Sequence, residues 1–299
     1  MAATASDTRI RPLRGDDVAA AERLTSASYH ELDLRTRTVG SPEAEPREGA
    51  AAQSWERRVH HLLRTDPGGC WVAEADGRLV GVAIGGRREL LWFLASYAVH
   101  PALQGQGLGR ALLAAAMQHR QGCLRAMLTA SPDPRALRLY RQAGFTLHPQ
   151  LLLRGEVDRT ALPAGTRVRE GALQDLDLLD SVDRRARGAG HGVDHELLAR
   201  EHRLVVADAG TGSGYAYVSD TGSPVLLAAT NRRTAAALLW EALAATLPGL
   251  PVEVARVTAA NEWAIDVGLA AGLEIHQRGY LALSHLEPPV PYLHHATLL

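Results

Sequence analysis

An internal repeat constrains the fold of this chain more than any other feature of its sequence. Residues 143–148 read AGFTLH, and residues 271–276 read AGLEIH. Near the start of each half, residues 8–11 (TRIR) and 166–169 (TRVR) form a second matching pair. The same order of expected strands and helices follows each start. We therefore expect two copies of one α/β domain in tandem.

The length fits that interpretation, because 299 residues are about twice a usual domain of ~150. A segment rich in Pro and Gly, residues 162–165 (LPAG), is typical of a linker. We place the two domains at residues 1–157 and 158–299.

Composition excludes several classes of function. The chain has 32 basic and 33 acidic residues, so it lacks the positive field that nucleic acid or an anionic membrane would need. It contains no Lys, which excludes Schiff-base chemistry and a Walker A phosphate loop. Its richness in Arg, Ala, Gly and Leu is typical of a GC-rich bacterial genome.

The two cysteines, Cys70 and Cys123, lie far apart in apolar surroundings and are expected to be reduced, buried side chains. The N-terminal segment is polar and shows no signal peptide. No uncharged apolar run is long enough to span a membrane. These features favour a cytoplasmic protein.

A glycine-rich turn at residues 104–109 (QGQGLG) carries the strongest functional signal. The preceding residues 89–99 read as a strand, and residues 110–119 read as a helix. Backbone N–H groups at a helix start have no partner within the helix, and the helix dipole adds partial positive charge there. Such a turn can bind a phosphate. The segment lacks the third glycine of a dinucleotide-binding fingerprint, since Arg110 occupies that position.

Two motifs in this region resemble those of the GNAT superfamily of N-acetyltransferases. The first is the pyrophosphate loop, matched by Gln104, Gly107 and Gly109. The second has the spacing Asn-x-x-Ala-x-x-x-Tyr-x-x-x-Gly-Phe and is matched from Asp133, which replaces the usual Asn, to Phe145. The resemblance covers residues 8–155. It implies two tandem GNAT-like domains, each a mostly antiparallel twisted sheet flanked by helices, with acetyl-CoA as cosubstrate.

The resemblance also implies roles for the matched residues. Tyr140 would protonate the leaving thiolate of CoA, an effect worth roughly 10²–10⁴-fold in rate. The strand before the loop would pair with the pantetheine arm, and the loop amides would hold the pyrophosphate. The implied cofactor-binding residues are Ala98, Val99, Gln104, Gly105, Gln106, Gly107, Leu108, Gly109, Arg110, Asp133, Ala136 and Tyr140.

The general base is less clearly marked. Many relatives carry a Glu on the strand before the loop, but Phe93 occupies the equivalent position. Glu89 is four residues earlier and is expected on the same face of that strand, so we name it as the catalytic base. The alternatives are Glu31, His30 and His100, a water chain, or the carboxylate of Leu299.

The second domain lacks this machinery. Residues 231–234 (NRRT) contain no glycine, and Gly268 stands at the tyrosine position. We therefore expect a degenerate GNAT-like domain without catalysis. His191 and His195 are spaced as metal ligands can be, with His202 and Asp194 nearby. Because Asp194 reads as a helix cap and no cysteine cluster accompanies it, no metal site is expected.

These observations predict an acetyl-CoA-dependent N-acetyltransferase that acts on a small-molecule primary amine. The chain would be a monomer, with the repeats as a pseudo-dimer, or a homodimer. One alternative is an acetyl-CoA-binding sensor or pseudoenzyme with no turnover. Another is an acetyltransferase similar to mycothiol synthase, in which the C-terminal half should be the better preserved one.

Overall fold

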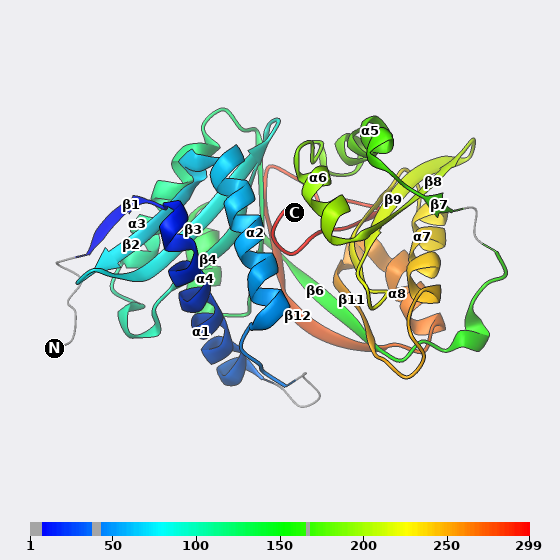
Figure 1. Cartoon of the computed structure of the whole chain (residues 1–299), viewed down its shortest axis with the longest axis horizontal. Helices are drawn as coiled ribbons and strands as arrows, with labels where there is room; N and C mark the ends of the chain where they lie inside the picture. Colours follow the sequence, from blue (N-terminus) through cyan, green and yellow to red (C-terminus); the bar gives the residue numbers. More distant parts are fainter. Residues whose placement is uncertain (1–7, 38–42, 166–167) are drawn as a thin grey trace. The chain divides into compact units, whose positions relative to one another are not determined.

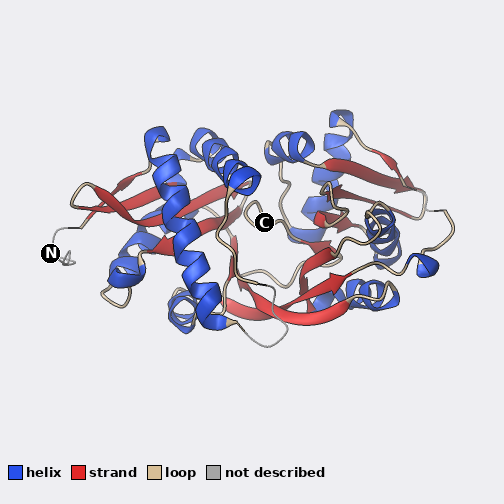
Figure 2. Cartoon of the chain, turned by 60° about the horizontal axis from the view of Figure 1, so that its bottom comes forward, coloured by secondary structure: helices blue, strands red, loops and turns tan. Residues whose placement is uncertain are grey.

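The computed structural model describes residues 8–37, 43–165 and 168–299 and divides after Gly144 into two compact units (Figure 1). Residues 1–7 of the N-terminal segment, and Thr166 and Arg167 of the TRVR repeat, lie outside the described residues. Helices and strands alternate in both units, as the secondary-structure view shows (Figure 2). The expected α/β fold with mixed sheets is confirmed. None of the helices in the described ranges is both long enough and apolar enough to cross a membrane.

The first unit alternates strands and helices in the predicted order. Its helices are α1 (Val18–Thr36), α2 (Gly49–Thr65), α3 (Leu108–Met117) and α4 (Pro134–Gln142). Its strands are β1 (Arg9–Pro12), β2 (Cys70–Ala75), β3 (Arg78–Arg88), β4 (Leu91–Val99) and β5 (Arg125–Ala130).

These strands form a sheet in the order β1-β2-β3-β4-β5. The first four are antiparallel, and β5 joins β4 in parallel. The β2–β3 hairpin closes through Asp76 and Gly77, both in the left-handed region, as the Asp-Gly signal predicts. The last pair of strands of the first unit is thus parallel, and α3 supplies the connection that such a pair requires.

Alternation along β3 assigns the helices to opposite faces of the sheet. A Cβ at Gly81 would meet Leu112 of α3, whereas a Cβ at Gly86 would meet Leu62 of α2. The two glycines stand on opposite faces, because successive residues of a strand alternate. Helix α2 thus packs on one face and α3 on the other, in agreement with Figure 1.

The second unit repeats this order after one additional strand. Its helices are α5 (Leu176–Arg187), α6 (Asp194–Glu201), α7 (Arg232–Ala244) and α8 (Glu262–Ala270). Its strands are β6 (Thr146–Gly155), β7 (Arg169–Glu170), β8 (Arg203–Ala209), β9 (Gly212–Val218), β10 (Pro224–Ala229), β11 (Val252–Thr258), β12 (Glu274–Ser284) and β13 (Tyr292–Leu293).

Five of these strands form a sheet in the order β13-β10-β9-β8-β7, and β6 pairs antiparallel with both β11 and β12. Strand β6 belongs to the first copy of the repeat in sequence, yet it pairs within the second unit. The compact units therefore divide after Gly144, whereas the sequence repeat placed the domain boundary at residues 157/158.

Alternation along β9 separates an apolar face from a polar one. Ala216 and Val218 belong to the hydrophobic core that α7 covers, together with Leu238 and Leu239. The residues between and beside them, Tyr215 and Tyr217, must point to the opposite face. Both tyrosines are fully buried there and carry hydrogen bonds to ionisable side chains.

His294, next to β13, provides a test of the second unit by pH. Its ring is buried between Gln150 of β6, which faces Nε2, and the main-chain oxygen of His295, which accepts from Nδ1 at 2.9 Å. Burial, aided by the nearby Arg256 guanidinium, lowers the pKa of His294 to about 3. The folded protein therefore gains the full stabilisation from the neutral ring at pH values above the pKa of His294 in the unfolded chain. This stabilisation is lost as the pH falls toward 3, the pKa of His294 in the folded protein.

We predict that lowering the pH from 7 to 5 costs the wild-type protein about 2 kcal/mol more unfolding free energy than it costs a His294→Gln variant. The comparison requires denaturant unfolding of both proteins at each pH. Equal losses in the two proteins would contradict a buried neutral His294.

Candidate functional site

Strands β4 and β5 pair over only part of their length. The parallel register runs from Leu91 to Leu94 of β4 and stops there. On its other edge, β4 stays paired with β3 as far as Val99. The β3 register shifts between Leu94 and Ser96, so that Ala95 has no partner and forms a bulge. Beyond this bulge, the main-chain N–H and C=O groups on the β5-side edge of β4 are not paired with β5 and can bind side chains or a ligand.

Two side chains occupy those main-chain groups. The hydroxyl of Tyr29, on α1, donates to the carbonyl oxygen of Tyr97 at 3.0 Å and accepts from its N–H at 3.3 Å. Gln104 Nε2 donates to the carbonyl oxygen of Val99 at 2.9 Å. The Oε1 atom of Gln104 is buried and has no hydrogen-bond partner in the part of the chain described here. The main-chain groups of this strand edge are therefore hydrogen-bonded to side chains, which a ligand could displace, and not to a neighbouring strand.

The glycine-rich turn has the conformation that a phosphate cradle needs. Gly105 and Gly107 have φ values of 81° and 89°, in the left-handed region that favours glycine. A Cβ at either position would meet no atom within 4 Å, so both face open space. Helix α3 starts directly afterwards at Leu108, and its first helical bond runs from Ala111 to Gly107. The N–H groups of the first turn have no acceptor within the helix.

Gly109 is needed for a different reason. A Cβ there would lie 2.4 Å from the hydroxyl oxygen of Tyr97, so this tyrosine packs directly on the start of α3. The other side of the Tyr97 ring meets Tyr140 edge-on, with ring centroids 6.2 Å apart. Tyr97 thus connects the strand edge, the start of α3 and Tyr140 of α4.

Tyr140 is fully enclosed, as a proton donor next to an apolar thioester would be. Burial, and then the neighbouring Tyr97 and Tyr29, raise the pKa of Tyr140 well above its usual value near 10. The phenol therefore keeps its proton at neutral pH and can donate it. Its position on α4 matches the sequence prediction.

Asp133 fixes the start of α4. Its carboxylate accepts from the Arg135 N–H at 2.9 Å, and Pro134 occupies the first helical position. Burial disfavours the charged carboxylate, but the bonds from Arg135 and the charge of Arg35 outweigh it and lower the pKa of Asp133. Asp133 is therefore the N-cap of α4, as an Asp directly before a Pro commonly is. Its bonds are directed to arginines and to the helix start.

The remaining residues of the predicted set lie around the loop. Ala98 is buried on β4, and Ala136 is half-buried on α4. Gln106 donates to the Ala102 carbonyl at 3.3 Å, and Arg110 donates to Gln142 at 3.2 Å. These bonds hold the loop onto the turn before it and onto α4.

Glu89 does not lie on the strand where it was expected. It is exposed in the β3–β4 turn with φ 50°, and β4 begins only at Leu91. The expectation that Glu89 lies on the same strand face as Phe93 is therefore wrong, because Glu89 precedes the strand. The alternation of apolar and polar residues could not reveal that residues 89 and 90 form a turn, because the turn depends on the left-handed backbone conformation of Glu89.

The other suggested bases occupy varied positions. His100 accepts from the Ala102 N–H at 3.3 Å and caps the short turn before the loop. Glu31 is exposed on α1, and the main-chain oxygen of Leu299 accepts from Arg187 in the second unit. His30 is half-buried next to Tyr29, and its Nδ1 atom is buried with no hydrogen-bond partner among the described residues.

Comparison with known proteins agrees with this geometry. Residues 28–145, which include the strand edge, the loop and Tyr140, match the acetyltransferase (GNAT) family. The matched residues, 28–145, form a GNAT acetyltransferase domain. No curated protein matches its sequence significantly.

Solved structures show that the tandem fold extends over the whole chain. A protein from Pyrococcus horikoshii classed as an acetyltransferase is 17% identical, with a TM-score of 0.71 over 94% of this chain and 90% of that one. A GCN5-related N-acetyltransferase from Sphaerobacter thermophilus is 20% identical, with a TM-score of 0.62 over 98% and 99%. A tandem GNAT protein from the clavulanic acid biosynthesis pathway is 19% identical, with a TM-score of 0.52 over 93% and 98%.

In the second unit, a side chain occupies the start of helix α7. Asn231 caps α7 by accepting from the Thr234 N–H at 2.9 Å and donates to the Thr211 carbonyl at 2.9 Å. The start of this helix is thus occupied by its own side chain. At the tyrosine position, a Cβ on Gly268 would lie 2.4 Å from Leu153 of β6, which leaves no room for an aromatic ring.

The close approach of Tyr97 and Gly109 can be measured by a double-mutant cycle. We predict that Gly109→Ala alone lowers the unfolding free energy by about 1–3 kcal/mol, because the new Cβ overlaps the Tyr97 hydroxyl. In a Tyr97→Phe background the nearest remaining atom is 3.6 Å away, so the same substitution should be neutral or stabilising. Denaturant unfolding of the four proteins gives the coupling energy. Equal costs in both backgrounds would disprove the contact.

Proposed function

We propose that the first unit binds acetyl-CoA and transfers its acetyl group directly to a primary amine of a small molecule. One observation carries this proposal. Beyond Leu94 the β5-side edge of β4 carries no strand, and a short turn at Pro101–Leu103 connects it to a left-handed glycine loop at the start of α3. An extended amide-containing arm that ends in a pyrophosphate has the two features that such a strand edge and such a loop can bind.

The side chains on this path have consistent roles in the proposal. The pantetheine amides would replace the side-chain bonds that Tyr29 and Gln104 make to the β4 edge. The N–H groups of the loop would bind the pyrophosphate. The amine would attack the thioester carbonyl, the C–S bond would break, and Tyr140 would donate a proton to the leaving sulfur. The amine must lose a proton, and His30 offers an unpartnered ring nitrogen on α1.

The second unit argues for one cosubstrate site per chain. Its helix start is capped by Asn231, and Gly268 replaces the tyrosine. A role similar to that of mycothiol synthase would place the better preserved site in the C-terminal half, and the closed α7 start does not favour this alternative. We propose that this unit takes no part in the chemistry.

The first test is a calorimetric titration with acetyl-CoA. We predict one site per chain, and we predict that Gly107→Glu weakens binding at least 100-fold because a carboxylate would project into the phosphate cradle. Gly122→Glu is the matched control. Gly122 also has a left-handed φ, 84°, and open space around it, but it lies in the turn before β5. Two sites per chain, or equal weakening in both variants, would contradict the proposal.

The second test separates an enzyme from a sensor. We predict that Tyr140→Phe lowers kcat by roughly 10²–10⁴-fold while the Kd for acetyl-CoA stays within about twofold, because the hydroxyl acts only on the leaving thiolate. Acetylation of a panel of primary amines, followed by release of free CoA thiol, provides the rates. A wild-type chain that binds acetyl-CoA but releases no thiol with any amine would favour the sensor. Unchanged rates in the variant would remove Tyr140 from the mechanism.

A further inference from the structure

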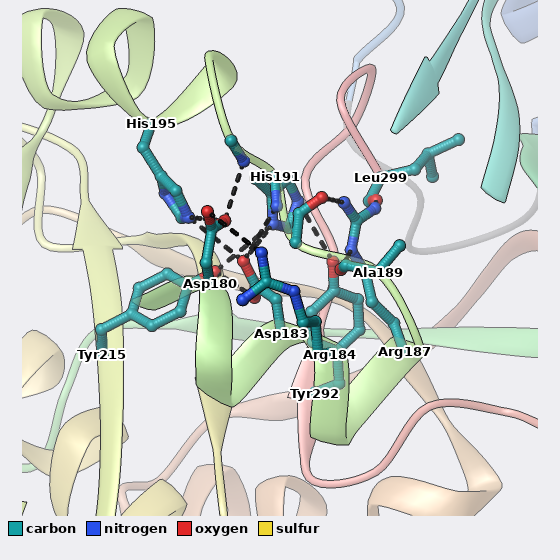
Figure 3. A network of polar contacts seen from close by, with 12 residues as sticks. Asp180, Asp183, Arg184, Arg187, Ala189, His191, His195, Tyr215, Tyr292 and Leu299 are labelled. Atoms are coloured by element: carbon teal, nitrogen blue, oxygen red, sulfur yellow. Dashed lines mark hydrogen bonds and ion pairs between the residues drawn. The ribbon is translucent and has the colours of Figure 1, made fainter. Parts of the chain in front are cut away.

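A buried polar cluster in the second unit lies far from the glycine loop in sequence. Asp183 of α5, His191 of the loop after it and His195 of α6 are all fully buried (Figure 3). Asp183 Oδ2 lies 2.7 Å from His191 Nδ1 and 3.1 Å from His195 Nε2. The three ligand atoms lie within 4.8 Å of one another, the only such group of three or more within the described ranges.

The tyrosines of the cluster determine where the proton of His195 lies. Tyr217 donates to the main-chain oxygen of His195 at 3.3 Å. Its hydroxyl oxygen is also 3.2 Å from His195 Nδ1, and with the hydroxyl proton directed to the main-chain oxygen, this nitrogen carries a proton and donates it. In the neutral ring, Nε2 then has only a lone pair. That lone pair faces the oxygens of two carboxylates, Asp183 at 3.1 Å and Asp180 at 3.4 Å.

Three acceptor atoms cannot face one another in a buried site without a positive charge between them. A proton on His195 Nε2 can serve one or two of these contacts. A divalent cation can serve all of them, and also His191, whose Nδ1 faces the same Asp183 oxygen. His191 would then carry its proton on Nε2, which lies 3.4 Å from the hydroxyl of Tyr292.

We propose that Asp183, His191 and His195 form a metal site for a first-row divalent cation, Zn²⁺ in particular, with Asp180 as the fourth ligand. Two imidazoles and carboxylate oxygens form a donor set that suits Zn²⁺. Ligand atoms about 2.0–2.2 Å from a tetrahedral Zn²⁺ are about 3.3 Å apart. The observed separations of 2.7, 3.1 and 3.4 Å need only a small expansion to reach that value.

The surroundings have the second layer of bonds that metal sites use. Tyr217 and Tyr292 would fix the two imidazoles through their outer nitrogens, and Tyr215 donates to the other oxygen of Asp183. Asp180 is partly exposed and would connect the site to solvent. The nearby Arg187 guanidinium is directed to main-chain oxygens of Ala189, Gly190 and Leu299, and not to the ligand atoms.

The site would be structural, because its ligands connect α5, the following loop and α6 below β9. The test uses the full-length untagged chain, dialysed against a chelator and then titrated with Zn²⁺ or Co²⁺. We expect one equivalent per chain, a Tm increase of several degrees, and a Co²⁺ visible spectrum of tetrahedral intensity. The spectrum requires no substitution, so it does not depend on whether a variant folds.

Variants then assign the site. His195→Gln and Asp183→Asn should reduce binding to less than about one-tenth of an equivalent. The control His294→Gln removes a buried histidine of the same unit outside the cluster and should bind one equivalent. No binding by the wild-type chain, or binding that survives both cluster substitutions, would overturn the proposal. In the first case the cluster is a metal-free ion pair, and in the second the metal binds surface histidines.

Discussion

The bulge at Ala95 is the constraint on which the site of the first unit depends. Up to Leu94, β4 has a neighbour on both edges, and its backbone groups are permanently paired. One unpaired residue bends the strand away from β5 while the β3 ladder continues to Val99. A buried strand edge must have its backbone groups satisfied. In this chain Tyr29 and Gln104 satisfy them with bonds that a ligand can replace.

Three tyrosines, Tyr29, Tyr97 and Tyr140, pack in series beside this strand edge. Tyr29 lies on the edge of Tyr97, and Tyr97 lies between Gly109 and Tyr140. Tyr140, the proposed proton donor, is therefore positioned by rigid rings and not by a flexible loop. Exclusion of water around these rings raises the pKa of the Tyr140 phenol further above its usual value near 10.

The sequence predicted features that rest on local rules and missed those that rest on distant contacts. The Asp76-Gly77 hairpin and the Asp133 cap follow from turn and cap preferences of a few residues, and both are confirmed. The pairing of β6 with β11 and β12 depends on strands about a hundred residues or more away, so the repeat alone could not assign it. Glu89 was placed on a strand by alternation, but its left-handed φ puts it in a turn.

The histidine cluster of the second unit also depends on contacts that local sequence rules do not predict. Spacing along the chain paired His191 and His195 with Asp194, the first residue of α6, and no local rule pointed to Asp183. The decisive feature is the alternation of β9, which sends Ala216 and Val218 into the apolar core. That alternation leaves Tyr215 and Tyr217 on the other face, where a buried hydroxyl needs a polar partner. Two tyrosines in alternation on a core strand therefore require a polar cluster beneath them, and the charged groups of α5 and α6 supply it.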